Sequence, residues 1–212
     1  RKVLSLNLTA EPYQAQRNEI LRLGKERLSS YVCIANVHMT IEAMDSKEFA
    51  SIVNGANMVT PDGMPLAKAL KWLYKQPQDR VCGMDLMPDI FKECEAKGLK
   101  VGMFGSTQEV LDAIEAKAKI EYPKLQFSGI ISPPFRPLTD EENAAYVAQF
   151  NEAETNILLV SLGCPKQEAW SALNHPKLNA VAVAIGGAFP VYAELQKRAP
   201  KWMQKFALEW LH

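Results

Sequence analysis

The sequence lacks several features that would assign it to a functional class at once. Its 24 Lys and Arg residues balance its 24 Asp and Glu residues, so no net positive charge favours a nucleic acid partner. No apolar stretch is long enough to span a bilayer and no signal peptide is recognisable, so we expect a cytoplasmic protein. The four cysteines lack paired metal-ligand spacing, which predicts free thiols in a reducing compartment and no zinc site: Cys33, Cys82, Cys94 and Cys164.

Two nucleotide-binding motifs are also missing. The chain contains neither G-x-G-x-x-G nor a Walker loop, so a Rossmann-type dehydrogenase and an ATP-binding protein both lack their fingerprint. The three histidines show no pattern that would pair one of them with Cys164. We therefore interpret Cys164 as a turn residue rather than a nucleophile.

Strand-like and helix-like segments alternate from end to end. This alternation predicts one α/β domain over residues 1–212, a Rossmann-like layered fold with a mostly parallel sheet flanked by helices. Capping boxes at 106–109 and 139–142 predict two helix starts. The expected strands are Val3–Leu8, Tyr31–Val37, Met58–Thr60, Lys100–Phe104, Leu125–Ile130, Asn156–Leu162 and Ala180–Ile185. The other expected helices include Glu11–Leu28, Met64–Tyr74 and Asp85–Lys97.

Three expected strands in the second half end in glycine, at Gly105, Gly163 and the pair Gly186-Gly187. In an open parallel sheet the ligand crevice lies beyond the carboxyl ends of the strands. Turns there present backbone N–H groups suited to a diphosphate. Glycine after a strand is also an ordinary turn residue, but three at corresponding strand ends favour a site.

The segment after Gly163 carries the densest group of polar residues. Pro165 fits the first turn of a helix, and Lys166, Gln167 and Glu168 add a cation, an amide and a carboxylate to that turn. A helix N-terminus of this kind can bind an anion. A solvated polar first turn explains the same residues, and spacing alone does not separate the two interpretations.

The first half supplies four further candidates. Asp62 lies in a Pro-Asp-Gly turn after a strand and would suit a general base, although spacing alone favours a plain turn. Asn36 and His38 end an expected strand and could hydrogen-bond a sugar or a base, or play a structural part. Arg80 could stabilise a leaving phosphate, or form a surface salt bridge with Asp85 as a helix N-cap.

The end of the chain, Gln196 to His212, interleaves basic and aromatic residues at helical spacing. Such a pattern suits a helix on a membrane surface. It equally suits a terminal helix that packs on the core with a solvated basic face. The same residues would also permit self-association into a homo-oligomer.

Taken in order, these segments resemble the WecG/TagA/CpsF family of bacterial glycosyltransferases over nearly the whole chain. Each motif is weak alone, and the ordered set is specific. The resemblance rests on Ala35–His38, Thr60–Gly63, Arg80–Leu86, Gly105, Tyr122-Pro123, Gly163–Glu168, Gly186-Gly187, Arg198–Pro200 and Glu209-Trp210.

The resemblance implies an inverting transfer of a sugar from a UDP-sugar to a lipid-diphosphate-linked acceptor at the cytoplasmic membrane face. It implies Asp62 as the general base, Gln167 as a residue that orients substrate and Arg80 as the group that stabilises the departing UDP. The family's donors include N-acetylmannosamine, its uronic acid and glucose. Residues expected to bind substrate are Asn36, His38, Gly105, Gly163, Pro165, Lys166, Glu168, Gly186 and Gly187.

The chain has no Asp-x-Asp, the motif by which many transferases hold a divalent ion on the diphosphate. We therefore expect no metal and no other cofactor, with backbone amides, helix N-termini and Arg80 replacing the ion.

The chain also departs from the family pattern. Ile34 and Ala35 stand where many members carry threonine before the asparagine, and Pro190 and Glu194 replace an expected aspartate and glycine. The second change predicts an altered pocket wall and donor choice. Family members continue beyond His212 into a basic tail, so we expect a domain without its membrane-associating tail. A non-catalytic nucleotide-sugar-binding subunit of a polysaccharide assembly system remains the alternative function.

Overall fold

The computed structural model describes residues 1–198, 200 and 203. The expectation of a terminal helix over 196–212 falls largely on residues outside this description.

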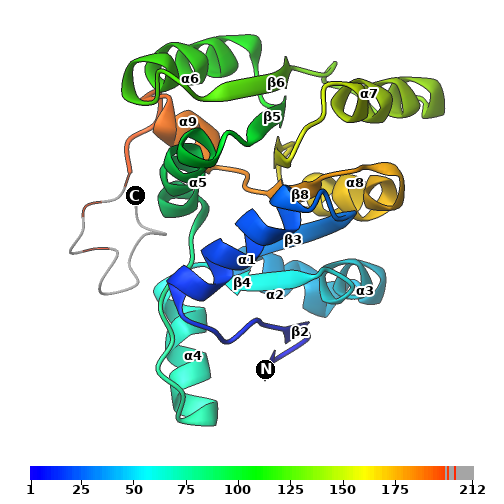
Figure 1. Cartoon of the computed structure of the whole chain (residues 1–212). Helices are drawn as coiled ribbons and strands as arrows, with labels where there is room; N and C mark the ends of the chain where they lie inside the picture. The colour runs from blue at the N-terminus through cyan, green and yellow to red at the C-terminus, as the bar shows by residue number, and fades with distance from the viewer. Residues whose placement is uncertain (199, 201–202, 204–212) are drawn as a thin grey trace.

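Six parallel strands form the central sheet, in the order β4-β3-β8-β7-β5-β6 (Figure 1). Almost every residue of the four inner strands is buried, which suits parallel strands covered on both faces. The predicted α/β fold with a parallel sheet flanked by helices is confirmed. The strands are β3 (Ser30–Ala35), β4 (Met58–Pro61), β5 (Lys100–Gly105), β6 (Gln126–Ile131), β7 (Ile157–Ser161) and β8 (Val181–Ala184).

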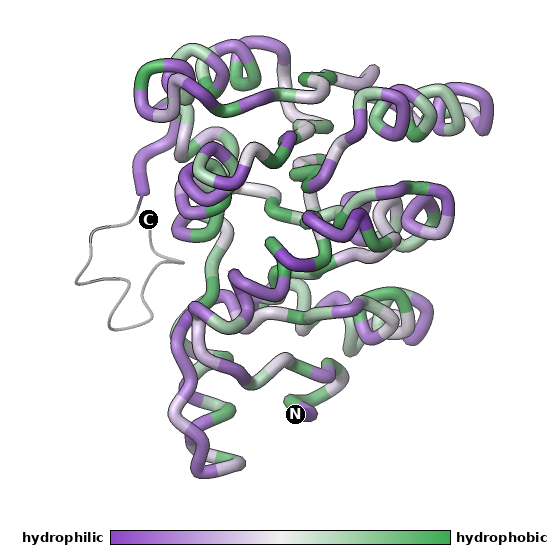
Figure 2. The backbone as a smooth tube through the Cα atoms, in the orientation of Figure 1, coloured by the Kyte–Doolittle hydropathy of each residue, from purple (hydrophilic) through white to green (hydrophobic). Residues whose placement is uncertain are grey.

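Helices cover both faces of this sheet. Their hydrophobic residues recur at intervals of three and four, as at Leu111, Ile114 and Ala118, so each helix buries one side. Figure 2 shows the resulting alternation of hydrophobic and hydrophilic residues along the outer helices. One core contains residues of α1 (Tyr13–Lys25), α5 (Gly83–Lys97), α6 (Gln108–Glu121) and α9 (Ala188–Tyr192). The other contains residues of α2 (Val37–Asp45), α3 (Lys47–Asn54), α4 (Met64–Tyr74), α7 (Asp140–Glu152) and α8 (Lys166–Asn174).

Alternate residues of each strand enter the two cores, because successive side chains of a strand point to opposite faces of the sheet. In β3, Val32 and Ile34 join the first core, whereas Tyr31, Cys33 and Ala35 join the second. The sheet is therefore held between two separate hydrophobic layers.

Three local predictions are wrong. The expected strand Val3–Leu8 is a hairpin of β1 (Lys2–Val3) and β2 (Leu6–Asn7), because the chain reverses at Leu4, whose φ is 52°. Val3, Leu6 and Leu8 are buried although Leu4 in the turn is exposed, so the hydrophobic pattern did not reveal the turn. Thr107 rather than Ser106 caps α6, whereas the capping box at Thr139 is confirmed.

The third error concerns α5, which begins at Gly83 with Cys82 as its N-cap, so Asp85 lies within the first turn and is not the cap. Asp85 can still favour this turn, because a carboxylate near a helix N-terminus interacts well with the helix dipole.

The connections between strands and helices open a crevice at the carboxyl ends of the strands. After β3 and β7 the chain continues into α2 and α8, which pack in the second core, whereas after β8 it continues into α9 in the first core. Because β8 lies between β3 and β7, the chain leaves neighbouring strands in opposite directions. A crevice at the carboxyl ends of these strands follows from this topology.

Candidate active site

A cavity of about 310 Å³ occupies this crevice. It brings together residues from both halves of the chain, as the resemblance implies. The expected site residues in its lining are Asn36, His38, Asp62, Gly163, Gln167, Gly186 and Gly187. The lining residues that the sequence analysis did not assign to the site are Ile34, Met39, Gly83, Met84, Cys164, Ala184, Ile185 and Ala188.

Asp62 is held at the edge of the sheet by its own backbone. Its N–H donates a 2.7 Å hydrogen bond to the carbonyl of Ala35, the last residue of β3. The next residue, Gly63, precedes α4, and Asp62 itself is half-buried. The loop thus fixes a carboxylate next to the start of α2.

Asn36 is the N-cap of α2, and its Oδ1 accepts a 2.9 Å hydrogen bond from the N–H of Met39. Because the side-chain oxygen of Asn36 is occupied by this capping hydrogen bond, its NH2 group is the part available to donate to a ligand. His38, in the first turn, is exposed, and its Nε2 lies 3.6 Å from Oε1 of Glu42. Both residues therefore face the cavity from one helix N-terminus.

Three helices of eight or more residues begin at this cavity. Asn36 starts α2, Gly83 and Met84 start α5, and Gln167 lies in the first turn of α8. A Cβ on Gly83 would lie 2.9 Å from the carbonyl oxygen of Ile185, so glycine permits α5 to approach the end of β8. The converging helix N-termini make the cavity attractive to an anion.

Gln167, in the cavity lining, forms a buried pair with Glu168, which does not line the cavity. Gln167 Nε2 donates a 2.8 Å hydrogen bond to Glu168 Oε1, and Glu168 is fully buried. Gln167 Oε1 and Glu168 Oε2 have no hydrogen-bond partner among the described residues. Burial raises the pKa of Glu168 to about 7, against the opposing effect of hydrogen bonds from Gln167 and Cys164.

Cys164 also lines the cavity and lies next to Glu168. Burial and the neighbouring Glu168 raise the pKa of the Cys164 thiol to about 12. A thiol in this state is protonated at neutral pH and is a poor nucleophile. The interpretation of Cys164 as a turn residue agrees with this environment.

Arg80 lines a second cavity of about 430 Å³, together with Tyr13, Asp85, Pro88 and Asp89. The two cavities lie on either side of the first turn of α5, since Gly83 and Met84 line one and Asp85 lines the other. Arg80 Nη2 lies 3.4 Å from Asp85 Oδ2, so the ion pair considered from the sequence is present.

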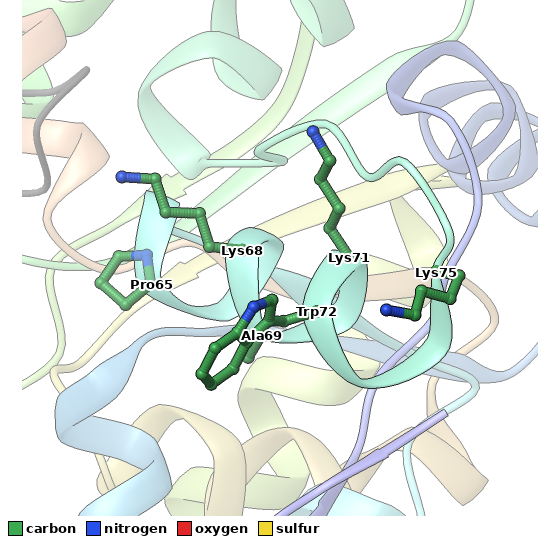
Figure 3. Close-up of a pocket in the computed structure, with 6 residues that line it drawn as sticks. All are labelled: Pro65, Lys68, Ala69, Lys71, Trp72 and Lys75. Atoms are coloured by element: carbon green, nitrogen blue, oxygen red, sulfur yellow. The ribbon is translucent and has the colours of Figure 1, made fainter.

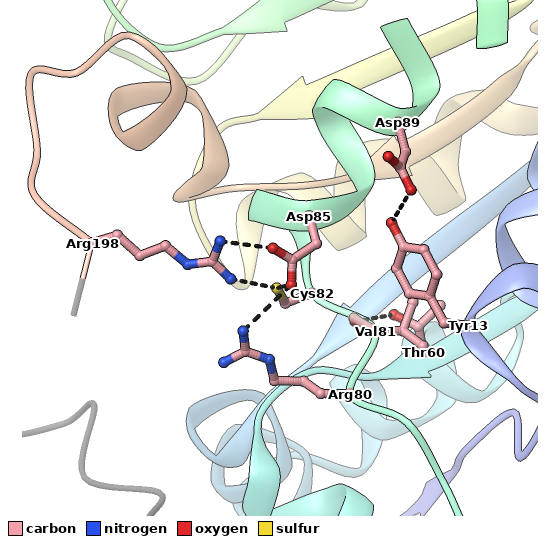
Figure 4. A network of polar contacts seen from close by, with 8 residues as sticks. All are labelled: Tyr13, Thr60, Arg80, Val81, Cys82, Asp85, Asp89 and Arg198. Atoms are coloured by element: carbon pink, nitrogen blue, oxygen red, sulfur yellow. Dashed lines mark hydrogen bonds and ion pairs between the residues drawn. The ribbon is translucent and has the colours of Figure 1, made fainter. Parts of the chain in front are cut away.

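Asp85 also binds a residue from the far end of the described chain. Arg198 Nη1 donates a 2.7 Å hydrogen bond to Asp85 Oδ1, so one carboxylate holds two guanidinium groups (Figure 4). Burial acts to raise the pKa of Asp85, but hydrogen bonds from Arg198 and Cys82 and the two positive charges outweigh it and lower the pKa. Asp85 and Arg198 were not among the expected site residues, although both lie in motifs that carry the resemblance.

Comparison with known proteins identifies the family. The model of the glycosyl transferase WecG/TagA/CpsF family matches residues 1–212. The chain belongs to this family.

Curated relatives of this glycosyltransferase are named N-acetylglucosaminyldiphosphoundecaprenol N-acetyl-beta-D-mannosaminyltransferase. The one from Bacillus subtilis (strain 168) is 22% identical over 188 residues, 88% of this chain and 72% of the relative. Those from Bacillus spizizenii and Staphylococcus aureus (strain NCTC 8325 / PS 47) are each 26% identical over 86% of this chain and 70% of the relative.

Five residues expected in the site of this WecG/TagA/CpsF family member do not line the main cavity. Arg80 lines the second cavity, and Glu168 lies behind Gln167. Gly105 is the last residue of β5 and pairs with Ser161 of β7. Pro165 is the N-cap of α8, and the Nζ of Lys166 lies 5.6 Å from the ring centre of Phe135. A direct substrate contact by any of these five residues stays a prediction.

The described residues also lack two features that bear on the site. In that part of the chain, no group of three or more His, Cys, Asp and Glu side chains is arranged to hold a metal ion. None of the helices described there has both the length and the apolar character needed to cross a bilayer.

Proposed function

We propose that this family member is an inverting glycosyltransferase that uses a UDP-sugar donor and a polyprenyl-diphosphate-linked acceptor at the cytoplasmic face of the membrane. The observation that carries the proposal is the shared cavity, which is lined by Asp62, by residues of three helix N-termini and by Gln167. The names of the relatives support an acceptor of this type and make N-acetylmannosamine the first donor to test.

Asp62 would act as the general base. Its carboxylate takes the proton of the acceptor hydroxyl as that oxygen attacks the anomeric carbon of the donor sugar. The bond from that carbon to the UDP oxygen breaks on the opposite side, and its electron pair leaves with UDP. One displacement of this kind inverts the anomeric centre without a covalent enzyme intermediate.

The diphosphate would lie against the N-termini of α2, α5 and α8. Their backbone N–H groups and dipoles stabilise negative charge, which increases on UDP as the bond breaks. Arg80 supplies a cation on the other side of the first turn of α5. Together these groups would do the work of a divalent ion, so we propose a metal-independent reaction.

Gln167 would orient the donor through its buried side-chain oxygen, which has no partner among the described residues. Because Glu168 accepts from Gln167 Nε2, it directs that nitrogen inward and leaves the oxygen for a hydroxyl or N–H of the substrate. Glu168 would thus act on the nucleotide-sugar through Gln167. This role differs from the direct contact expected from the sequence, because Glu168 is fully buried.

Calorimetric titration with UDP, with and without EDTA, tests the donor site, with AMP and NAD as control ligands. We expect binding of UDP alone, unaffected by EDTA. Transfer from UDP-N-acetylmannosamine to a lipid-diphosphate-linked N-acetylglucosamine, followed by mass spectrometry and by NMR of the new anomeric centre, then tests the reaction. UDP binding without transfer from any candidate donor would favour the non-catalytic subunit, and transfer that manganese restores after EDTA would contradict metal independence.

A further inference from the structure

Helix α4 exposes an unusual number of large apolar residues. Its inner side is ordinary, since Leu66 and Leu70 are buried in the second core. Its outer side carries Trp72, which is 85% exposed, and Leu73, which is 60% exposed. Figure 1 shows α4 projecting from the molecule beside the edge strand β4. A tryptophan so exposed on a projecting helix is typical of a contact surface rather than of a hydrophobic core.

Lysines surround this tryptophan. A shallow hollow of about 720 Å³ is lined by six residues of α4 and its C-cap, and three of them are lysines (Figure 3). The sequence has no Asp or Glu between Asp62 and Asp79, so no acidic side chain of this segment neutralises them. The Arg1 guanidinium, 5.7 Å from the ring centre of Tyr74, adds a further cation beside the helix. The lining residues are Pro65, Lys68, Ala69, Lys71, Trp72 and Lys75.

We propose that this basic face, formed by Lys68, Lys71, Trp72 and Lys75, docks on a bilayer that contains anionic phospholipid. Lysine side chains interact favourably with lipid phosphates, and the amphipathic indole of tryptophan settles at the headgroup level. A second copy of the chain fits less well, because a two-fold contact through this face would bring lysines against lysines.

The position of α4 relates this surface to the site. The helix begins two residues after Asp62, and at 1.5 Å per residue Trp72 lies about 12 Å along the helix axis from the first residue, Met64. Docking of α4 would therefore hold the mouth of the Asp62 cavity close to the lipid headgroups. This part of the inference rests on the proposed function, because docking near the headgroups helps the enzyme only if its acceptor is linked to a membrane lipid.

Sedimentation with vesicles tests the proposal on the whole chain. We expect binding to vesicles of phosphatidylglycerol and phosphatidylcholine, little binding to phosphatidylcholine alone, and a decrease with added salt. At about 1 kcal/mol per lysine, the triple variant K68Q/K71Q/K75Q should bind about 100-fold more weakly, and W72S should also lose affinity. The control K25Q/K92Q/K124Q removes the same charge from exposed lysines elsewhere and should bind like the wild type.

Three results would overturn the proposal. The first is equal binding of the two triple variants, and the second is no binding of the wild type to anionic vesicles. The third is wild-type self-association, measured by sedimentation velocity without lipid, that K68Q/K71Q/K75Q abolishes, which would assign the face to a second copy. The variant D62N keeps the test separate from the proposed function, because it should lose transfer yet bind vesicles normally. With a water-soluble acceptor analogue, K68Q/K71Q/K75Q should retain transfer if the enzyme function is correct.

Discussion

The side chain of Gln167 donates a 2.8 Å hydrogen bond to its sequence neighbour Glu168, and both residues are buried beside the candidate site. Adjacent residues on a helix seldom face each other, but here the long Gln167 side chain turns toward the carboxylate. This contact fixes the orientation of the Gln167 amide beside the cavity. It also ties a titratable group to the geometry of the substrate site.

The raised pKa of Glu168 predicts a pH-dependent stability. Its pKa rises from an ordinary 4.5 to about 7 on folding, because burial disfavours the charged form. Between these values the folded chain keeps a proton that the unfolded chain loses, so the free energy of unfolding falls as the pH rises and levels off above pH 7. Glutamine does not titrate, so E168Q lacks the pH dependence of stability that Glu168 causes. The free energy of unfolding of E168Q, relative to that of the wild type, should therefore rise by about 3 kcal/mol from pH 4.5 to pH 7.

Urea denaturation of both proteins across this pH range measures the difference. E152Q, at an exposed position of α7, is the matched control and should follow the wild type. Parallel profiles for E168Q and wild type would show that Glu168 titrates normally.

Replacement of Asp62 by asparagine tests the proposed base. D62N keeps the size and the backbone hydrogen bond to Ala35 but cannot take a proton, so transfer should fall about 10²–10⁴-fold. UDP affinity should change little, because the carboxylate acts on the acceptor. Single-turnover assays and UDP calorimetry measure the two effects, and a D62N enzyme with near wild-type turnover would eliminate Asp62 as the base.

Arg80 is expected to matter more for turnover than for ground-state binding. Negative charge grows on UDP only as the bond breaks, so R80A should lower kcat by about 10² and weaken UDP binding less. R136A is a suitable control, because Arg136 forms a similar ion pair with Glu142, at 2.7 Å, on an exposed surface. Equal losses in kcat and UDP affinity would instead indicate that Arg80 contributes uniform binding.

The two neighbouring glycines at the end of β8 should respond differently to alanine. Gly186 has a φ of 50°, and a Cβ there would lie 3.1 Å from Gln167 Nε2. Gly187 has a φ of −61°, and a Cβ there would meet no atom within 4 Å. G186A should cost about 1–2 kcal/mol of stability and weaken UDP-sugar binding by moving Gln167, whereas G187A should be near neutral for stability. Thermal unfolding and calorimetry compare the pair, and indistinguishable stabilities would contradict the packing of Gly186 on Gln167.

The sequence by itself determined the fold class and several parts of the site. Alternating strand and helix patterns predict an α/β protein because hydrophobic periodicity reports which side of each element is buried. Gly163 and Gly186 follow β7 and β8 and have a positive φ. Glycine adopts a positive φ more readily than other residues, so these turns can be recognised from the sequence alone. The Pro-Asp-Gly turn at Asp62 and the first turn of α8 are recognisable for the same reason.

Only the tertiary structure decided which of these residues share a cavity. Asp62 follows β4 and Gln167 follows β7, and they share a cavity because the sheet order β4-β3-β8-β7 places these strand ends near one another. Strand order depends on packing between distant segments. The same applies to Asp85, which joins Arg80 to Arg198, and to Glu168, which lies inside rather than at the surface. The hairpin at Leu4 escaped prediction because Val3 before the turn and Leu6 and Leu8 after it are all buried. Local sequence patterns indicate which residues are buried and where the chain turns, whereas the distances between strand ends depend on the order of the strands in the assembled sheet.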